Sequence, residues 1–188
     1  MRSTKRLPAS RLFSGACAAL LVAGWLVACG RDATAPYAGW DTVTDSEGVY
    51  KIRFLAPPWE RIDTGAAGGI SLLVPPVFGS LDAGAPSKYS FDAKLVPGLA
   101  LPVVQAEVVR VSGARVLLAP TPFATISEDR GFTAVLEDVA RLRYFRLVAL
   151  TAPGGRTLLV RVTLNEDPRN DREIDAMVRA IDVRPFVD

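Results

Sequence analysis

Apolar and polar residues alternate along much of this chain, which predicts β-strands. Residues 49–55 place tyrosine, isoleucine and phenylalanine at every second position, with lysine and arginine between them. Residues 88–96 show the same period more clearly, and residues 70–74 are an apolar run between glycine and proline pairs. A period of two is typical of a strand with one buried face. We therefore expect strands at all three places, with a turn-rich loop over residues 76–87.

The second half of the chain predicts a meander of antiparallel strands. Residues 132–136, 142–150 and 156–164 are apolar segments of strand length, and the Ala-Pro-Gly-Gly turn at 152–155 joins the last two as a hairpin. A shorter strand is expected at residues 116–118.

Residues 102–111 are open to two interpretations. Pro102 suits the first position of a helix, whereas the valines that follow favour a strand. A helix is the expectation, and a strand stays the alternative.

The C-terminal region predicts one amphipathic helix. Asn170 and Glu173 fit a capping box at its start, and Pro185 stops it. The apolar stripe has the helical spacing i, i+3, i+4, i+7 and consists of Ile174, Met177, Val178 and Ile181. Such a helix against an antiparallel sheet predicts an α+β fold.

The N-terminus has the marks of an export signal. Four basic residues open the chain, no acidic residue precedes Asp32, and an apolar run covers residues 16–28. These thirteen residues are well short of the ~20 that a membrane-spanning helix needs. The run ends at Leu26-Val27-Ala28-Cys29, which resembles the lipobox of bacterial lipoproteins.

That resemblance implies cleavage between Ala28 and Cys29 and a lipid on the Cys29 thiol. Residues 1–28 are then the signal peptide, residues 29–44 the lipidated cysteine with a flexible tether, and residues 45–188 a single α+β domain. An uncleaved N-terminal helix is the alternative. Both interpretations place the domain outside the cytoplasm, because positive residues stay on the cytoplasmic side.

The resemblance also bears on localisation in the cell envelope. In lipoproteins that are retained at the inner membrane an aspartate follows the lipidated cysteine, whereas here Gly30 follows it. The periplasmic side of the outer membrane is therefore expected over the inner membrane.

Composition excludes several classes of function. Removing residues 1–28 takes away four basic and no acidic residues, which leaves 18 basic and 20 acidic residues and argues against nucleic-acid binding. The chain has no histidine, and its two cysteines are Cys17, which leaves with the signal, and the lipidated Cys29. Histidine-based and thiol-based catalysis and the usual zinc sites are thereby excluded. We expect no catalytic residue, no metal and no cofactor.

Some acidic residues remain as candidates for chemistry. Asp63-Thr64-Gly65 matches the triplet of dimeric aspartic proteases, in which two carboxylates share a proton, but polar residues precede it where that family has an apolar strand. A cluster of acids precedes and enters the C-terminal helix without the spacing of a calcium loop, so helix capping is the expected role of Glu166, Asp167, Asp171 and Asp175.

Arginines and tryptophans are the remaining candidates for contact with a partner. On a strand, Arg141 and Arg143 share one face and Arg146 lies on the other, so a solvated strand face is expected rather than one basic stripe. Trp40 and Trp59 are candidates for partner-facing anchors, because tryptophan is enriched in binding hot spots. Closing the edge of a core is the alternative role of both tryptophans.

The strand at 49–55, the Pro57-Pro58-Trp59 break after it, the late hairpin and the terminal helix together resemble PsbP-type domains. The resemblance covers residues 45–188 by pattern. It implies an antiparallel sheet flanked by helices in an α/β/α sandwich, and a role in binding and assembly without a shared active site.

These observations lead to an expected function. We expect a membrane-anchored envelope lipoprotein that acts as a non-catalytic binding or assembly module for a protein partner. The alternative is a small-molecule or lipid-binding lipoprotein with a pocket beneath residues 76–87. A dimeric aspartic protease acting through Asp63 is a remote alternative.

The lipid anchor predicts a change in mass when Cys29 is replaced. Protein extracted from membranes is expected to have the mass of residues 29–188 plus acyl groups, and the Cys29→Ser variant to lack those groups, because the acyl chains are attached through this residue. Intact-mass spectrometry of both proteins is the measurement. A full-length mass for both would instead indicate a retained N-terminal helix.

Overall fold

The computed structural model describes residue 37 and residues 39–62, 69–74, 89–111 and 113–184. The chain divides into two compact units, Met1–Ala38 and Gly39–Asp188, and the second contains every strand and helix described below. Cys29, Ala28, Asp63 and the loop expected at 76–87 lie outside the described residues.

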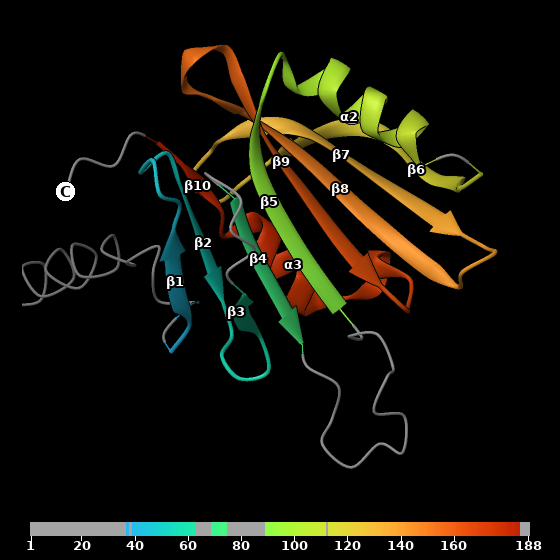
Figure 1. Cartoon of the computed structure of the whole chain (residues 1–188), viewed down its shortest axis with the longest axis horizontal. Coiled ribbons are helices and arrows are strands. Elements are labelled where there is room, and N and C mark those ends of the chain that lie inside the picture. The colour runs from blue at the N-terminus through green and yellow to red at the C-terminus, as the bar shows by residue number, and fades with distance from the viewer. Residues whose placement is uncertain (1–36, 38, 63–68, 75–88, 112, 185–188) are drawn as a thin grey trace, which may run out of the picture. The chain divides into compact units, whose positions relative to one another are not determined.

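Seven antiparallel strands form the main sheet of the second unit (Figure 1). In spatial order they are β3 (Glu60–Ile62), β4 (Gly69–Val74), β5 (Tyr89–Pro97), β9 (Arg156–Leu164), β8 (Arg143–Ala152), β7 (Arg130–Asp138) and β6 (Arg115–Ala124).

A second sheet has three antiparallel strands with β2 (Tyr50–Phe54) in the middle, between β1 (Asp41–Thr44) and β10 (Asp182–Val183). Two α-helices complete the unit, α2 (Ala100–Arg110) and α3 (Arg172–Arg179). Short 3₁₀ turns η2 (Pro153–Gly155) and η3 (Pro168–Asn170) precede β9 and α3. The chain is therefore a mostly-sheet α+β fold.

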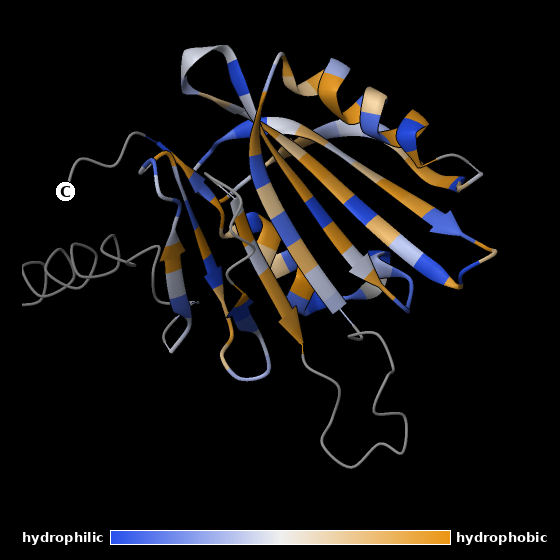
Figure 2. Ribbon diagram, in the orientation of Figure 1, coloured by the Kyte–Doolittle hydropathy of each residue, from blue (hydrophilic) through white to orange (hydrophobic). Residues whose placement is uncertain are grey.

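The larger core lies against one face of the seven-stranded sheet. Alternate residues of β5 and β9 are buried there, including Phe91, Val160 and Val162, and apolar bands alternate with polar ones along the strands (Figure 2). The apolar side chains of β2 belong to the same core, and so do Ile174 and Met177 of α3. This core joins the two sheets and α3 into one packed unit.

Helix α2 packs on the opposite face of the same sheet. Leu147 and Ala149 of β8 form a second core with Ala100 and Val104 of α2, whereas their neighbour Val148 belongs to the larger core. Because successive side chains of a strand point to opposite faces, the two cores lie on opposite sides of the sheet. The helix packs against β6, β7, β8 and β9 (Figure 1).

Most of the expected strands are confirmed. Strands β2, β4, β5 and β9 match their predicted ranges within one or two residues, and residues 102–110 belong to the helix α2 rather than to a strand. Strand β6 is much longer than the three residues expected, because its pairing with β7 continues past two register shifts.

Three short strands were not predicted. Strand β1 pairs with β2 along Asp41–Thr44, so the expectation of a tether through residue 44 is wrong, and the folded part begins earlier. Strands β3 and β10 have three and two residues, which is too short for a period to show. The prediction that Pro185 stops the C-terminal helix is also wrong, because α3 ends at Arg179 and β10 follows it.

The residue that caps α3 also differs from the prediction. The side chain of Asp171 accepts hydrogen bonds from the backbone N–H groups of Glu173 and Ile174, at 3.0 and 3.1 Å, whereas the prediction named Asn170 as the cap. Asp171 has extended backbone angles and Asn170 belongs to η3, so only Asp171 is placed to cap.

Among the helices of the described residues, none has the length and apolar character needed to cross a membrane.

Gly131 of β7 is predicted to be intolerant of any side chain. A Cβ at this position would lie 1.8 Å from the carbonyl oxygen of Ala149, so the backbones of β7 and β8 would have to separate. We expect Gly131→Ala to lower the free energy of unfolding by about 3 kcal/mol, the upper end for overpacking. Urea denaturation measures the change.

Gly155→Ala is the control for backbone strain alone. Gly155 has a φ of +69° and open space around its Cβ position, so we expect a loss of only ~1 kcal/mol. Equal losses for the two variants would contradict the steric explanation.

Candidate functional site

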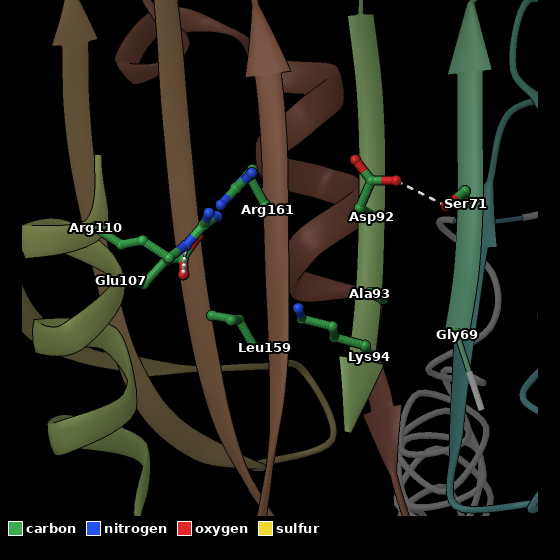
Figure 3. A pocket seen from close by; sticks show the side chains of 9 residues that line it. All are labelled: Gly69, Ser71, Asp92, Ala93, Lys94, Glu107, Arg110, Leu159 and Arg161. Carbon is green, nitrogen blue, oxygen red and sulfur yellow. Dashed lines mark hydrogen bonds and ion pairs between the residues drawn. The ribbon is translucent and has the colours of Figure 1, made fainter. Parts of the chain in front are cut away.

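A pocket of about 310 Å³ with a mixed polar and apolar lining lies beside α2, on the face of the sheet that this helix partly covers (Figure 3). Three strands of the main sheet and α2 contribute to its lining, which consists of Gly69, Ser71, Asp92, Ala93, Lys94, Glu107, Arg110, Leu159 and Arg161. All of these residues belong to the described part of the chain.

Strand register brings the sheet residues of the pocket together. Ser71 lies opposite Asp92, which in turn lies opposite Arg161, so one row crosses β4, β5 and β9. The next row consists of Gly69, Lys94 and Leu159. Arg161 and Leu159 pair further with Leu147 and Ala149 of β8, which α2 covers, so both rows lie on the same face as the helix.

Glu107 is the charged centre of the helix side of the pocket. It is only 8 % exposed, and Arg110 donates to both of its oxygens, from Nε to Oε2 at 2.8 Å and from Nη2 to Oε1 at 2.7 Å. Arg161 of β9 also donates to Oε1 through Nη2. One carboxylate therefore pairs with two guanidinium groups, and through Arg161 it links α2 to β9.

Arg161 retains unused hydrogen-bonding capacity. Its Nε is buried and has no hydrogen-bond partner, while the side chain as a whole is 29 % exposed. A buried donor without a partner costs about 1–3 kcal/mol, so this guanidinium lies in a site that would gain from an additional acceptor.

Asp92 and Lys94 face the pocket from β5 and differ in their hydrogen bonding. Asp92 accepts a hydrogen bond from Ser71 at 2.7 Å and a longer one from Ser90 at 3.5 Å. Lys94 points across the sheet toward Leu159 (Figure 3), and it makes no hydrogen bond or ion pair with any residue that the structure describes. Its ammonium group is therefore available to a ligand.

The arrangement favours binding through charge and hydrogen bonds. The pocket has three cationic side chains and two carboxylates, together with the apolar side chain of Leu159. Within the described residues, no group of three or more potential ligands could hold a metal ion. The pocket therefore presents hydrogen-bond donors that have no partner among the described residues, next to an apolar surface.

The tryptophans lie elsewhere, in or near the larger core. Trp59 is 1 % exposed, its Nε1 donates to Glu173 at 2.6 Å, and its ring stacks on Tyr89 with centroids 6.2 Å apart. The prediction that Trp59 faces a partner is wrong, because the chain after the proline pair turns its ring into the core. Trp40 is half-buried and packs against the same core.

The acidic residues near α3 act through caps and ion pairs. Asp171 caps the helix, and Asp167 binds Arg169 with its carboxylate. Burial raises the pKa of Asp175, but hydrogen bonds from Arg179 and Arg146 outweigh burial, so the pKa lies below its ordinary value. These carboxylates are held by the fold and do not converge on one point.

The three arginines of β8 and the turn before it have separate roles. Arg146 is only 8 % exposed, pairs with Asp175 at 2.9 Å and lies over the ring of Phe123, so the expectation of a solvated side chain is wrong for this residue. Arg141 pairs with Asp138 in the turn. Arg141 thus lies in the turn and not on the strand, so the prediction that it shares a strand face with Arg143 is wrong.

Sequence reasoning did not find the pocket. Asp92 and Lys94 were placed correctly on the polar face of their strand, but Glu107, Arg110 and Arg161 carried no local signal of a shared site. An arginine inside the apolar run of β9 was the one available hint, because a charge on a strand that is otherwise buried needs a partner.

Comparisons with known proteins leave the function open. No protein-family profile matches this chain, and no curated protein matches it. The chain is similar to a crystal structure from Bacteroides thetaiotaomicron VPI-5482, with 9 % identity and a TM-score of 0.44. That match covers 78 % of this chain and 49 % of the other, so the chain spans about half the length of the protein that it matches.

We predict that the two ion pairs of Glu107 contribute differently to the free energy of unfolding. Glu107→Gln removes the charge between two guanidiniums and leaves the half-buried Arg161 without compensation. We expect a loss of about 2 kcal/mol, less than the 3–5 of a fully buried pair because Arg161 is partly exposed. Arg110→Ala removes a 60 % exposed partner and is expected to cost about 0.5 kcal/mol.

Urea denaturation of the two variants measures these losses. Equal losses would contradict the prediction that the Glu107–Arg161 pair contributes more to stability than the Glu107–Arg110 pair.

Proposed function

We propose that this chain is a membrane-anchored envelope lipoprotein whose α+β unit is a non-catalytic binding module. The resemblance of residues 26–29 to a lipobox supports a lipid on Cys29 and a periplasmic location, with the outer membrane favoured over the inner one. The lack of histidine, and of any cysteine other than Cys17 and Cys29, supports a role without catalysis.

The proposal extends to the fold. The packing of α2 and α3 into separate cores on opposite faces of the seven-stranded sheet supports a PsbP-like α/β/α arrangement. In that arrangement the three-stranded sheet lies beside α3 as an addition to the sandwich.

A small molecule is the ligand that the geometry supports best. The observation that carries this proposal is the pocket beside α2, where neither Lys94 nor the Nε of Arg161 has a partner among the described residues. Its volume of about 310 Å³ is at the lower end of the ~300–1,000 Å³ that small-molecule sites occupy. The pocket expected beneath residues 76–87 involves residues outside the described part of the chain, so it stays a prediction.

A protein or assembly partner is the second candidate. Val109 near the end of α2 and Val116 and Leu118 of β6 expose 77 %, 48 % and 37 % of their surface, and β6 is an edge strand. Exposed apolar side chains at a sheet edge are typical of surfaces that bind another chain. The protease alternative rests on Asp63 alone and stays remote.

Blocking the pocket sterically tests the binding function whatever the charge of the ligand. Ser71→Tyr places a ring in the pocket wall, and Thr42→Tyr places the same ring at an exposed position of β1, in the three-stranded sheet and outside the pocket lining. We expect the protein purified in detergent to bind members of a mixture of small acids, amines and neutral amides, and Ser71→Tyr to lose this binding by about tenfold. Ligand-observed NMR measures it.

Thr42→Tyr is expected to bind as the wild type does. If the wild type binds no member of any charge class, or if Ser71→Tyr binds unchanged, the pocket has no binding function.

A further inference from the structure

We propose that the pocket beside α2 binds a small organic carboxylate: a single negative charge attached to an apolar body. This inference rests on the proposed binding function and specifies its ligand class. It follows from which groups in the pocket lack partners, from the sum of the charges, and from the mixed lining.

The groups without partners are hydrogen-bond donors. The ammonium of Lys94 binds no described residue, and Arg161 has a buried Nε without an acceptor, although its Nη2 is engaged by Glu107. The acceptors, in contrast, already have partners: Glu107 accepts from two arginines, and Asp92 accepts from Ser71 at 2.7 Å. A ligand that supplies acceptor oxygens therefore meets donors that have no partner among the described residues, whereas each carboxylate of the pocket already has at least one donor.

The sum of charges sets the charge of the ligand. Lys94, Arg110 and Arg161 contribute three positive charges, and Asp92 and Glu107 two negative ones, which leaves a single positive charge. A carboxylate neutralises it. A phosphate monoester carries about −1.5 to −2 at neutral pH and would leave excess negative charge next to Asp92, where like charges repel. The geometry therefore favours a carboxylate over a phosphate.

The lining also accommodates an apolar body. Leu159 and the aliphatic stem of Lys94 lie side by side in one row of the sheet, with Gly69 next to Lys94 leaving room (Figure 3). A volume of about 310 Å³ corresponds to roughly ten water molecules at ~30 Å³ each, which is the size of a ligand with one ring. Asp92 at the far side disfavours a second acidic group, so monocarboxylates are expected to bind better than dicarboxylates.

Four aromatic probes of similar size and different charge test the proposal. Benzoate, benzamide, benzylamine and phenyl phosphate are titrated into the protein purified in detergent, with ligand-observed NMR and the shift in melting temperature as readouts. We expect benzoate to bind with a Kd of roughly 1 mM, as befits a fragment, and at least about tenfold more tightly than the other three. Phthalate, with its second carboxylate, is expected to bind more weakly than benzoate.

Variants assign the binding to the pocket. Lys94→Met keeps the stem and removes the charge, so benzoate affinity should fall about tenfold. Asp92→Asn removes the repulsion, so phenyl phosphate should gain about threefold or more while the fold stays intact. Arg130→Met, an exposed cation on β7 outside the pocket lining, is the matched control and should leave all four affinities unchanged.

The outcomes separate this inference from the proposed function. If benzamide, benzylamine or phenyl phosphate binds the wild type as tightly as benzoate and Ser71→Tyr abolishes that binding, the pocket binds small molecules but the carboxylate assignment is wrong. The same conclusion follows if Lys94→Met leaves benzoate binding unchanged. If none of the four probes and no member of the mixture binds, both the inference and the proposed function fail.

Discussion

The pairing of β5 with β9 is the constraint on which the rest of the structure depends. Nine consecutive residue pairs join these strands without a shift in register. The pairing puts Phe91 and Val162 on the face of the larger core and Asp92 and Arg161 on the opposite face. Because side chains alternate with a period of two, a slip by one residue would exchange the two sets and bury the charges. The apolar core thus enforces the register that assembles the pocket.

Glu107 adds a second constraint, which acts between the helix and the sheet. Burying its carboxylate costs desolvation, and the ion pairs with two arginines offset this cost without making the contact a large source of stability. The contact also fixes the position of the helix, because it holds the last turn of α2 against β9. Glu107 therefore both positions α2 on the sheet and forms part of the pocket wall.

The sequence predicted those parts of the fold that have a local pattern. Strands β2, β5 and β9 were found because each has several alternating residues, and the apolar stripe of α3 was found from Ile174, Met177 and Val178, which the structure buries. Strands β3 and β10 are too short to show a period, and they form through pairing with longer neighbours. The cap of α3 was misplaced by one residue, since Asn170 and Asp171 are equally good caps by type and only the backbone distinguishes them.

The pocket could not be predicted in the same way, because its contacts are distant in the chain. Arg161 and Glu107 are separated by 54 residues, and Ser71 and Asp92 by 21. The alternation placed Asp92 and Lys94 on the polar face of their strand. The sequence pattern of a strand face is the same, however, whether that face is exposed to solvent or lines a pocket. The burial of Trp59 also depends on distant residues, since Glu173 and Tyr89 supply its hydrogen bond and its stacking partner.

Incomplete coverage of one sheet face by one helix explains why a pocket forms at this place. The face under α2 is apolar in β7 and β8, where Ala134, Leu136 and Leu147 need cover, and it becomes polar at Arg161 and Asp92. A second helix over the polar positions of β4 and β5 would bury charges without gaining apolar contact. The pocket lies at the boundary between the apolar positions that α2 covers and the polar positions beside it. At this boundary Lys94 and Arg161 retain donors that no described residue uses, and these donors are the ones that the proposed carboxylate would meet.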